Sequence, residues 1–498
     1  MICLFNLVSL IFNILFLEKL LHVYQLKDYN NCRYFSFFKK KYVIFIIFYA
    51  ILLIFLIFLK NLYILWLFSI LVFSCQFVYI KSLIQNKKTP LKYTSRLKHS
   101  YLISVVILLG FSFFKFSVIA CSILIYFLPP ISNCLNLYDK LKNKKFIKQA
   151  QKKLKTLQLK IIAITGSNGK TSVKNILYEM LKTNYKVVKT PASFNTPLGI
   201  AMCINNDVDE TTEILILEYG ARRIGDIELL CKTFGADYGI LTSISPQHLE
   251  TFKNVSNIAK AKNELPKFLQ NNLCVFNVDS PYSRDLFCKK TGRKIAVSCE
   301  TKSNTYTSNI KIENGKTNFK FNINNQTFAC STKLLGKHNV MNILLALTIA
   351  KEFNITTEKI IEVIENLCPT PHRLELIKTH INILDDSYNC SLSSAKYAIE
   401  VLNCFAGKKM IVTPGIIEGG KQEKQLNFEL GEMCASCDYV VIVGNHNKEN
   451  LLLGLQTKNF DTKKILFAQN LEYAKQYFKL LSCGDNLLIL NDLPDDYN

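Results

Sequence analysis

The chain has 498 residues, of which 49% are apolar, and a formal net charge of +23 at pH 7. The length leaves room for about three domains, and so apolar a composition argues against a wholly soluble protein. Residues 1–160 contain 23 Lys/Arg and three Asp/Glu, so +20 of the charge lies there and +3 in the remaining 338 residues. A nucleic-acid-binding protein carries its basic patch on a folded domain. Here the excess flanks apolar segments, which predicts a membrane lipid partner and argues against nucleic acid.

The N-terminal region has four apolar stretches, at about 2–16, 42–59, 62–80 and 101–131. The second and third are long enough, or nearly so, to cross about 30 Å of hydrocarbon as helices. The fourth has Gly110 and Lys115 near its middle, which favours two short spans or a re-entrant hairpin. We therefore predict a transmembrane region of three to five spans over residues 1–132.

The basic residues between these stretches predict the orientation. Residues 18–41, 81–100 and 139–160 carry six, six and nine Lys/Arg, whereas Lys60 is the one basic residue between the second and third stretches. The positive-inside rule places the three basic segments in the cytoplasm and the N-terminus outside. The prediction is a multi-pass protein of the inner membrane, with a basic helical connector over residues 133–158 leading to domains that face the cytoplasm.

A phosphate cradle is predicted directly after this connector. The apolar, mostly β-branched run Ile161–Ile164 is typical of a buried parallel strand. A glycine-bearing turn follows, and then a helix from about Val173 to Leu181. Such a turn presents backbone N–H groups to an anion, while Lys170 reaches the outer phosphates and the Thr171 hydroxyl can bind Mg²⁺. Because Ile164 stands where the first Walker glycine would be, an ordinary strand-to-helix turn with an exposed lysine is the alternative at this point.

Strands and helices alternate after the turn, which predicts a parallel sheet with helices on both faces. The expected strands are Lys186–Lys189, Glu213–Tyr219, Tyr238–Thr242 and Leu273–Asn277. Residues 304–334 change to period-two alternation with turns at 314–315 and 324–325, which predicts β-hairpins appended to the sheet. A helix is expected again over residues 336–353.

A second α/β series begins near Arg373. Its expected strands are Ile381–Leu384, Lys409–Thr413, Tyr439–Val443, Lys464–Phe467 and Asn486–Leu490. About 125 residues suit a small Rossmann-like domain. The predicted fold class is therefore α/β, with a P-loop-type ATPase domain at 159–371 and a Rossmann-like domain at 372–498, preceded by the α-helical transmembrane region.

Three further residues stand where such a sheet places its ligand groups. Glu218 ends a buried strand, where a carboxylate can hold Mg²⁺ beside the phosphates, although a surface glutamate is the plainer interpretation. His248 follows another strand end, and a lone loop histidine is more often structural than catalytic. Lys262 falls on a helix expected over 258–269, where spacing alone indicates a solvated charge.

Together these residues resemble the Mur ligase family of ATP-dependent amide ligases, most closely its D-alanyl-D-alanine-adding branch. The motifs that match, in the family's order, are Thr165–Thr171, Asn195–Gly199, Glu218–Ala221 with Gly225–Ile227, His248–Phe252 with Ala261–Glu264, Leu335–Asn339 with Asn342, Arg373, and Asp385–Asn389. The resemblance covers about residues 159–490. It implies ATP and two Mg²⁺ ions as cofactors, with muramyl peptide and D-alanyl-D-alanine as substrates in peptidoglycan synthesis.

The resemblance also implies roles for particular residues. The catalytic residues would be Lys170, His248, Lys262 and Arg373, with Lys262 a candidate for carbamylation by CO₂. Metal would be bound by Thr171, Glu218 and His248. ATP would be bound by Gly166, Ser167, Asn168, Gly169, Lys170, Thr171, Ser172, His338, Asn342, Arg373 and Asp386. The substrate residues would be Asn195, Thr196, Arg222, Ser387 and Asn389.

The chain departs from the family pattern where the acceptor is recognised. Apolar segments stand in place of the usual N-terminal domain that binds UDP, and Arg222-Arg223 replaces an expected asparagine. The acceptor is therefore expected to be UDP-linked, or else a lipid-linked or other carboxylate. A different class of function, a nucleotide-binding membrane scaffold without turnover, stays open. A transporter ATPase is less well supported, since no ABC-type signature follows the phosphate turn.

Overall fold

The computed structural model describes residues 2–26, 29, 31, 34–35, 91–113, 117–247, 249–388, 390–417 and 419–491. The described residues form two compact units, one drawn from residues before Lys145 and the other from Lys145 onward. Each unit is described by itself below.

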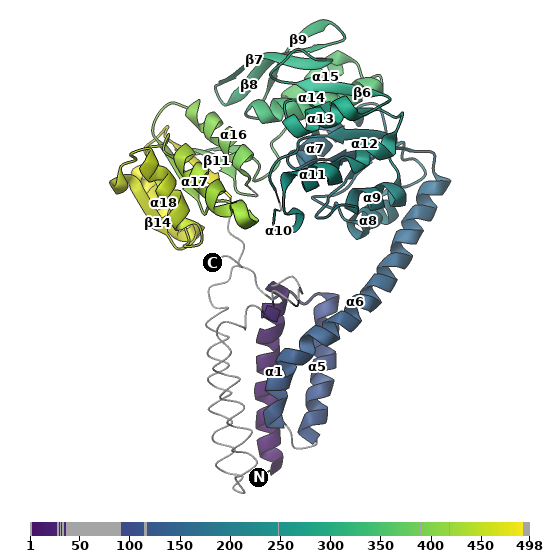
Figure 1. Ribbon diagram of the computed structural model, residues 1–498, viewed down its shortest axis with the longest axis vertical. Coiled ribbons are helices and arrows are strands. Elements are labelled where there is room, and N and C mark those ends of the chain that lie inside the picture. The colour runs from purple at the N-terminus through teal and green to yellow at the C-terminus, as the bar shows by residue number, and fades with distance from the viewer. Residues whose placement is uncertain are drawn as a thin grey trace. The chain divides into compact units, whose positions relative to one another are not determined.

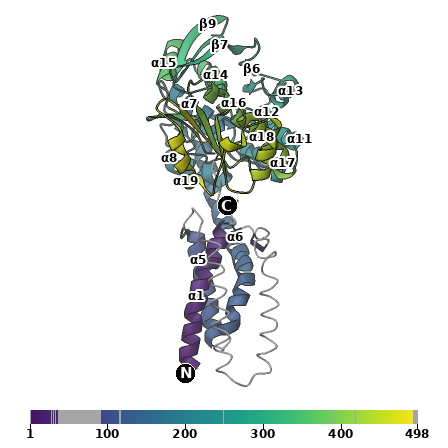
Figure 2. The ribbon, with the colours of Figure 1, turned by 90° about the vertical axis from the view of Figure 1, so that its left-hand side faces the viewer.

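The first unit is helical. Its helices in the described residues include α1 (Ile2–Leu26), α5 (Ser95–Phe113) and the first part of α6 (Ser117–Thr156). They lie side by side in Figure 1 and again in the rotated view of Figure 2. Buried leucines, among them Leu20, Leu97 and Leu128, form their shared core. The Arg96 guanidinium donates a hydrogen bond of 2.7 Å to the Ser132 hydroxyl, which joins α5 to α6.

Within the described residues, no helix is sufficiently long and apolar to cross a membrane. The membrane spans predicted in the stretches 2–16 and 101–131 are corrected accordingly. The stretch 101–131 is divided between α5, which ends at Phe113, and α6, which begins at Ser117, as the prediction of two segments near Gly110 and Lys115 expected. Its apolar parts, and the 15 apolar-rich residues of the stretch 2–16, are each shorter than the ~20 residues that a spanning helix needs. The predicted stretches 42–59 and 62–80 lie outside the described residues.

The second unit contains a central mixed sheet. In the described part of the chain its spatial order is β2 (Val187–Lys189), β3 (Ile214–Glu218), β1 (Lys160–Thr165), β4 (Tyr238–Leu241), β5 (Cys274–Asn277), β6 (Lys294–Ser298), β7 (Thr305–Glu313), β8 (Lys316–Ile323) and β9 (Gln326–Thr332). Neighbours pair in parallel as far as β7, and β7–β8–β9 are antiparallel. The predicted appended hairpins are confirmed, with turns at 314–315 and 324–325.

Helices cover both faces of this sheet (Figure 1). One face packs against α7 (Lys170–Leu181), α14 (Lys337–Glu352) and α15 (Thr357–Asn366). The other face packs against the end of α6, α8 (Pro197–Asp207), α9 (Asp226–Phe234), α11 (Val255–Lys262), α12 (Glu264–Leu269) and α13 (Pro281–Lys289). The short α10 (Leu249–Phe252) precedes α11. The single helix predicted over 258–269 is thus divided, and Lys262 ends α11.

A second sheet follows in the same unit. Its order is β10 (Glu375–Lys378), β11 (Asn382–Asp386), β15 (Asn486–Leu490), β12 (Lys409–Thr413), β13 (Tyr439–Val443) and β14 (Ile465–Ala468). All neighbours are parallel except the β10–β11 pair. One face carries α16 (Leu392–Asn403), α17 (Glu423–Cys434) and α18 (Lys448–Thr457), and the other carries α19 (Leu471–Ala474) and η3 (Lys475–Leu480). The remaining 3₁₀ turns are η1 (Gly420–Gln422) and η2 (Thr462–Lys464).

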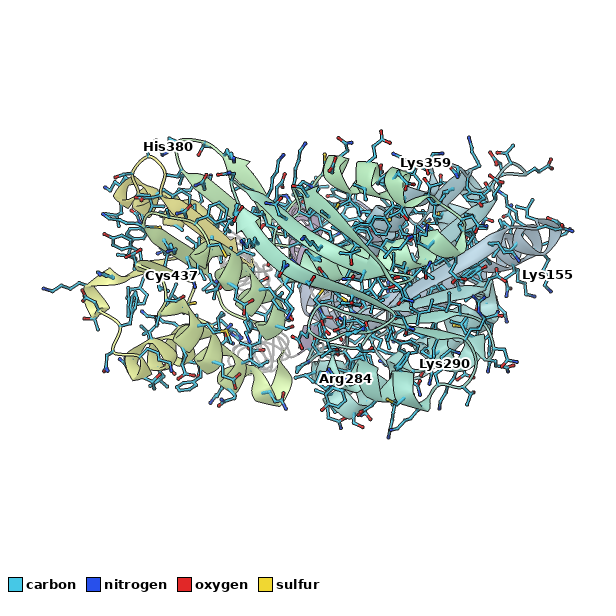
Figure 3. The ribbon with its side chains drawn as sticks, turned by 90° about the horizontal axis from the view of Figure 1, so that it is seen from above. Lys155, Arg284, Lys290, Lys359, His380 and Cys437 are labelled. Atoms are coloured by element: carbon cyan, nitrogen blue, oxygen red, sulfur yellow. The ribbon has the colours of Figure 1, made fainter. Side chains whose placement is uncertain are left out.

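Figure 3 shows the two sheets of this unit with their side chains, with His380 and Cys437 labelled on the second sheet's part and Arg284, Lys290 and Lys359 on the first sheet's part. Strands β6 and β10 were not predicted. The predicted domain limits, 159–371 and 372–498, stay predictions.

Candidate active site

A polar cavity of about 390 Å³ lies at the carboxyl ends of β1 and β3. The strand register creates it, because Ile164 of β1 pairs with Glu218, the last residue of β3. The chain leaves β1 after Thr165, makes the turn 166–169 and enters α7 at Lys170. The Glu218 carboxylate is therefore delivered beside the turn and the helix N-terminus.

Two glycines of the turn are required by close approach. A Cβ on Gly166 would lie 2.0 Å from the Thr242 hydroxyl oxygen. Gly169 has φ +82, and a Cβ there would lie 2.5 Å from Asn342 Oδ1. A side chain at either position would collide with Thr242 or Asn342, and the positive φ of Gly169 is one that other residues rarely adopt, so glycine suits both positions.

The turn is also anchored to its surroundings. The Ser167 N–H donates to the Ser243 carbonyl at 2.8 Å. The Asn168 amide donates to the hydroxyls of Ser245 and Ser391, each at 3.1 Å. Ser391 caps α16, which packs on the second sheet. The turn, which follows a strand of the first sheet, therefore also contacts the region of the second sheet.

Lys170 bends back over the turn. Its ammonium donates to the carbonyls of Gly166 and Ser167, both at 2.8 Å. Burial lowers the pKa of Lys170, while the nearby Glu218 carboxylate raises it and Arg373 lowers it further. A cation held at this place, beside a helix N-terminus, suits the binding of phosphate oxygens.

The Glu218 carboxylate is buried and fully partnered. Its Oε2 accepts from the Thr171 hydroxyl at 2.9 Å and lies 3.3 Å from the Lys174 ammonium. Its Oε1 accepts from the Asn195 amide at 3.1 Å. Burial alone would raise the pKa of Glu218, but Lys170 and Lys174 together hold it below its usual value. The carboxylate is therefore ionised at neutral pH.

These donors fit a magnesium ion. Mg²⁺ prefers hard oxygen ligands and is commonly bound by one or two carboxylates together with substrate phosphates. Thr171 and Glu218 supply a hydroxyl and a carboxylate at the phosphate turn. Among the described residues, no group of three or more His, Cys, Asp or Glu is placed to hold a metal. His248, the residue predicted for a second metal, lies outside the described residues.

Lys262 lines the same cavity although spacing alone indicated a solvated charge. It is 3% exposed, at the end of α11. Burial lowers the pKa of Lys262 well below its ordinary value, and Lys170 adds to this effect, while Glu218, Glu264 and Asp226 oppose it. The side chain is thereby biased towards its neutral amine.

α14 contributes His338 and Asn342. The His338 ring stacks on Tyr397 with centroids 5.5 Å apart, and its Nδ1 is buried without a hydrogen-bond partner among the described residues. Burial lowers the pKa of His338 to about 4. A smaller cavity of about 270 Å³ adjoins here and is lined by His338, Tyr397 and Asp279 among others. The uncharged His338 ring, stacked on Tyr397, gives this cavity one flat face next to the phosphate turn.

The second sheet's part contributes Arg373, Asp386 and Tyr388. The Arg373 guanidinium lies over the Tyr388 ring, 4.3 Å from its centroid. The Tyr388 hydroxyl donates to the Ser193 hydroxyl at 3.2 Å. Asp386 accepts from the Leu374 N–H at 3.1 Å, and burial raises the pKa of Asp386 to about 7.

Most of the predicted site residues lie together. The cavity is lined by Gly166, Ser167, Asn168, Gly169, Lys170, Thr171, Ser172, Asn195, Glu218, Arg222, Lys262, His338, Asn342, Arg373 and Asp386. Thr196 does not line it, since its hydroxyl caps α8 by accepting from the Gly199 N–H at 3.3 Å. Ser387 is also outside the lining, with its hydroxyl 3.4 Å from His372 Nδ1. Asn389 lies outside the described residues.

Sequence reasoning missed three residues at this site. Ser193 and Tyr388 line the cavity and bond to each other, and no local pattern predicts that pairing. Lys174 had a signal, because it shares the stripe 174, 177 and 181 with buried leucines of α7. A lysine on the apolar side of a helix is unusual enough to be singled out.

Comparisons with known proteins agree with this geometry. A family model described as the Mur ligase middle domain matches residues 164–350. The chain is 32% identical over 288 residues to the UDP-N-acetylmuramoyl-tripeptide–D-alanyl-D-alanine ligase of Bacillus subtilis, a match covering 56% of this chain and 61% of that enzyme. It is 30% identical over 329 residues to the ligase of the same name from Buchnera aphidicola (subsp. Baizongia pistaciae), covering 61% of this chain and 71% of that enzyme.

Among solved structures, the MurF ligase from Thermotoga maritima in complex with ADP superposes with a TM-score of 0.63 at 28% identity. That match covers 70% of this chain and 80% of the other. The matched regions therefore include more than the phosphate turn alone, while the chain spans about three fifths of the Bacillus subtilis enzyme.

Proposed function

The chain belongs to the Mur ligase family of ATP-dependent amide ligases, and from that premise we propose that it joins D-alanyl-D-alanine to the carboxylate of a muramyl peptide. The relatives named for this reaction support the choice of substrates. The product would be a precursor of peptidoglycan.

One observation carries the proposal. Lys170, Thr171 and Glu218 meet at the phosphate turn, with Lys262 and Arg373 lining the same cavity. A nucleotide-binding scaffold without turnover would need the turn, but it would not need the buried Glu218 carboxylate and the buried Lys262 in the same cavity. This combination favours an enzyme.

The first step would be attack of the acceptor carboxylate on the γ-phosphorus of ATP, with release of ADP and formation of an acyl phosphate. Negative charge increases at the γ-phosphate oxygens during this step, so catalysis depends on positioning and electrostatic stabilisation. Lys170 and Arg373 would supply positive charge from opposite sides of the cavity. Mg²⁺, held by Thr171 and Glu218, would neutralise phosphate charge.

In the second step the free amine of the dipeptide would attack the acyl carbon, which forms the amide and expels inorganic phosphate. Water would destroy the acyl phosphate, so the site must exclude it. The hydrogen bond from Tyr388 to Ser193 joins the regions of the two sheets at the edge of the cavity, where it would help to exclude water. The adjoining cavity at His338 and Asn342 would take the base and ribose, with Asp386 accepting a ribose hydroxyl.

Lys262 would act in its carbamylated form. The lowered pKa of Lys262 favours the free amine, which adds CO₂ to form a carbamate and releases one proton. The carbamate would add a second carboxylate to the cavity that Glu218 also lines, and it would supply a further oxygen ligand for Mg²⁺.

We also propose that the protein is attached to the inner membrane with this site facing the cytoplasm. The support is the concentration of +20 charge and apolar stretches in residues 1–160. That location, and Arg222 at the cavity in place of an expected asparagine, favour a lipid-linked acceptor as the second candidate substrate.

The test is to offer the purified full chain UDP-linked and lipid-linked muramyl peptides, each with D-alanyl-D-alanine and ATP, and to weigh the products by mass spectrometry. We expect one product to gain the mass of the dipeptide less one water, with one ADP formed per product. ATP hydrolysis that neither acceptor accelerates, with no mass gain, would contradict the proposal.

A further inference from the structure

Lys174 is a buried charge that the proposed reaction does not use. It lies on α7 one turn beyond Lys170, and its residue is 0% exposed. Placing an ammonium in a protein interior is costly unless it is paired and hydrogen-bonded. A methionine or leucine would fill this position of α7 without that cost, so the charge calls for a function.

The ammonium of Lys174 contacts two groups that belong to different parts of the site. One is the Glu218 Oε2 atom at 3.3 Å. The other is the carbonyl oxygen of Ala192, to which Lys174 donates a short hydrogen bond. Ala192 is an alanine with φ +43, in the left-handed region that non-glycine residues rarely adopt. The lysine thus holds the carbonyl of a residue whose backbone is strained.

Ala192 belongs to the segment 190–196, which follows β2 and carries the candidate acceptor residue Asn195. The Asn195 amide donates to the other oxygen of the same carboxylate, Glu218 Oε1, at 3.1 Å. The Asn195 carbonyl accepts from the Gly220 N–H at 3.1 Å, and a Cβ on Gly220 would lie 2.7 Å from Asn195 Cγ. Two of the side chains that hold the segment, those of Lys174 and Asn195, therefore end on one carboxylate.

We propose that Lys174 is a positioning residue that couples Glu218 to the segment 190–196, so that binding of a magnesium nucleotide at Glu218 orders the segment that receives the acceptor. The inference rests on the proposed function for the name of the acceptor, but the coupling itself does not depend on that name. In the observed orientation of Glu218, Lys174 contacts one carboxylate oxygen and Asn195 contacts the other. A ligand that fixes this orientation also fixes the anchors, and Lys174 transmits the effect to Ala192.

The coupling predicts an effect that needs no acceptor and no turnover. In the full chain, ADP together with Mg²⁺ should slow amide hydrogen exchange of residues 190–196 by about tenfold, the ratio that one net hydrogen bond is worth. ADP without Mg²⁺ should protect the phosphate turn and leave the segment nearly unchanged.

The variant that tests the role is Lys174→Met, which keeps the length of the side chain and removes the charge. We expect the protection of residues 190–196 by ADP and Mg²⁺ to be lost, while the affinity for ADP without Mg²⁺ stays within about twofold of the parent. Lys174→Arg should restore part of the protection. Lys182→Met is the matched control, because Lys182 follows α7, has a 47% exposed side chain and contacts Glu179 instead, and it should behave as the parent.

Protection of the segment that persists undiminished in Lys174→Met would overturn the inference. If that variant does not fold, Ala192→Gly keeps the inference testable, since glycine adopts φ +43 without cost. With Lys174 intact, Ala192→Gly should raise the melting temperature and keep the exchange protection of residues 190–196. Loss of that protection in Ala192→Gly would mean that the backbone geometry of the alanine, and not the lysine, holds the segment.

The two proposals fail in different ways. Failure of the ligase assignment would appear as absence of an amide product, with the exchange result unaffected. Failure of the coupling would appear in the exchange data even if the amide product forms.

Discussion

The phosphate turn 166–169 and the acceptor segment 190–196 lie on neighbouring sides of one cavity and are held in different ways. Close backbone approach fixes the turn, because Gly166 and Gly169 leave no room for a Cβ. The acceptor segment is held by side chains instead. Lys174 of α7 and Asn195 of the segment itself both contact the Glu218 carboxylate. The first arrangement is disturbed by any side chain added at Gly166 or Gly169. The second can be loosened by one side chain, and this makes it the part that a ligand can order.

Lys170→Ala should give the largest effect and would test the turn. Loss of a cation aimed at the transferred phosphate should lower the rate of ATP-dependent ligation by about 10²–10³-fold, measured as phosphate release in the presence of both substrates. Lys182→Ala on the exposed end of the same helix is the control and should keep the parent rate. Equal rates in the parent and in Lys170→Ala would remove this lysine from the mechanism.

Glu218→Gln should remove the charge that links the phosphate site to the acceptor segment. The Lys174 and Glu218 side chains are only 1% and 2% exposed, so removing one charge leaves the other uncompensated, at a cost of about 3–5 kcal/mol in unfolding free energy. The double variant Lys174→Met with Glu218→Gln should lose less than the sum of the single variants. Urea unfolding without nucleotide measures all three, and strict additivity would mean that the pair is not coupled.

The two regions also differ in how far the sequence alone predicts their residues. The turn was predictable because glycines and Lys170 act through their immediate neighbours in the chain, and Glu218 because a strand end is a local feature. The turns at 314–315 and 324–325 were predictable for the same reason. The contacts of Lys174, Ser193 and Tyr388 join elements that are distant in the sequence, so only the folded structure reveals them.

The missed strands have local explanations. β6 is five residues long and begins with Lys294, and β10 is an edge strand in which Lys378 is exposed. Neither strand has the continuous apolar run that indicates a buried parallel strand. The helix expected over 258–269 is interrupted at Asn263, which lies between α11 and α12. The interruption buries Lys262 at the cavity, which spacing alone could not reveal.

Asp386, the last residue of β11 in the second sheet, should make the stability of the protein depend on pH. Burial raises the pKa of Asp386 from 3.8 to about 7, so between those values the folded state holds a proton that the unfolded chain releases. Stability from this group is therefore present below about pH 4 and is lost as the pH rises towards 7. Asp386→Asn should lack this loss, so the difference in melting temperature between parent and variant should shift in favour of the variant from pH 4 to 7.

Nucleotide binding should follow the opposite trend if Asp386 accepts a ribose hydroxyl as a carboxylate. The affinity of the parent for ADP should rise with pH through about 7, and that of Asp386→Asn should stay flat. A parallel rise in both proteins, measured by titration calorimetry, would assign the titration to another group.

Tyr388→Phe should have the smallest effect. The variant loses the 3.2 Å hydrogen bond to Ser193 but keeps the ring beneath Arg373, and one such bond is worth about 0.5–1.5 kcal/mol. We expect a two- to tenfold rise in KM for the acceptor with kcat little changed. Tyr473→Phe, on the exposed α19, is the matched control. An unchanged KM in Tyr388→Phe would show that the hydrogen bond to Ser193 does not contribute to acceptor binding.

The central claim is that this cavity activates a carboxylate with ATP, and transfer of oxygen tests it most directly. An acceptor labelled with ¹⁸O in its reacting carboxylate is incubated with the full chain, ATP, Mg²⁺ and D-alanyl-D-alanine, and the released phosphate is analysed by mass spectrometry. The account predicts one ¹⁸O in each phosphate formed with product, and no labelled phosphate from Lys170→Ala beyond its residual turnover. Phosphate that carries no ¹⁸O while ATP is consumed would contradict the account, because water would then be the attacking group.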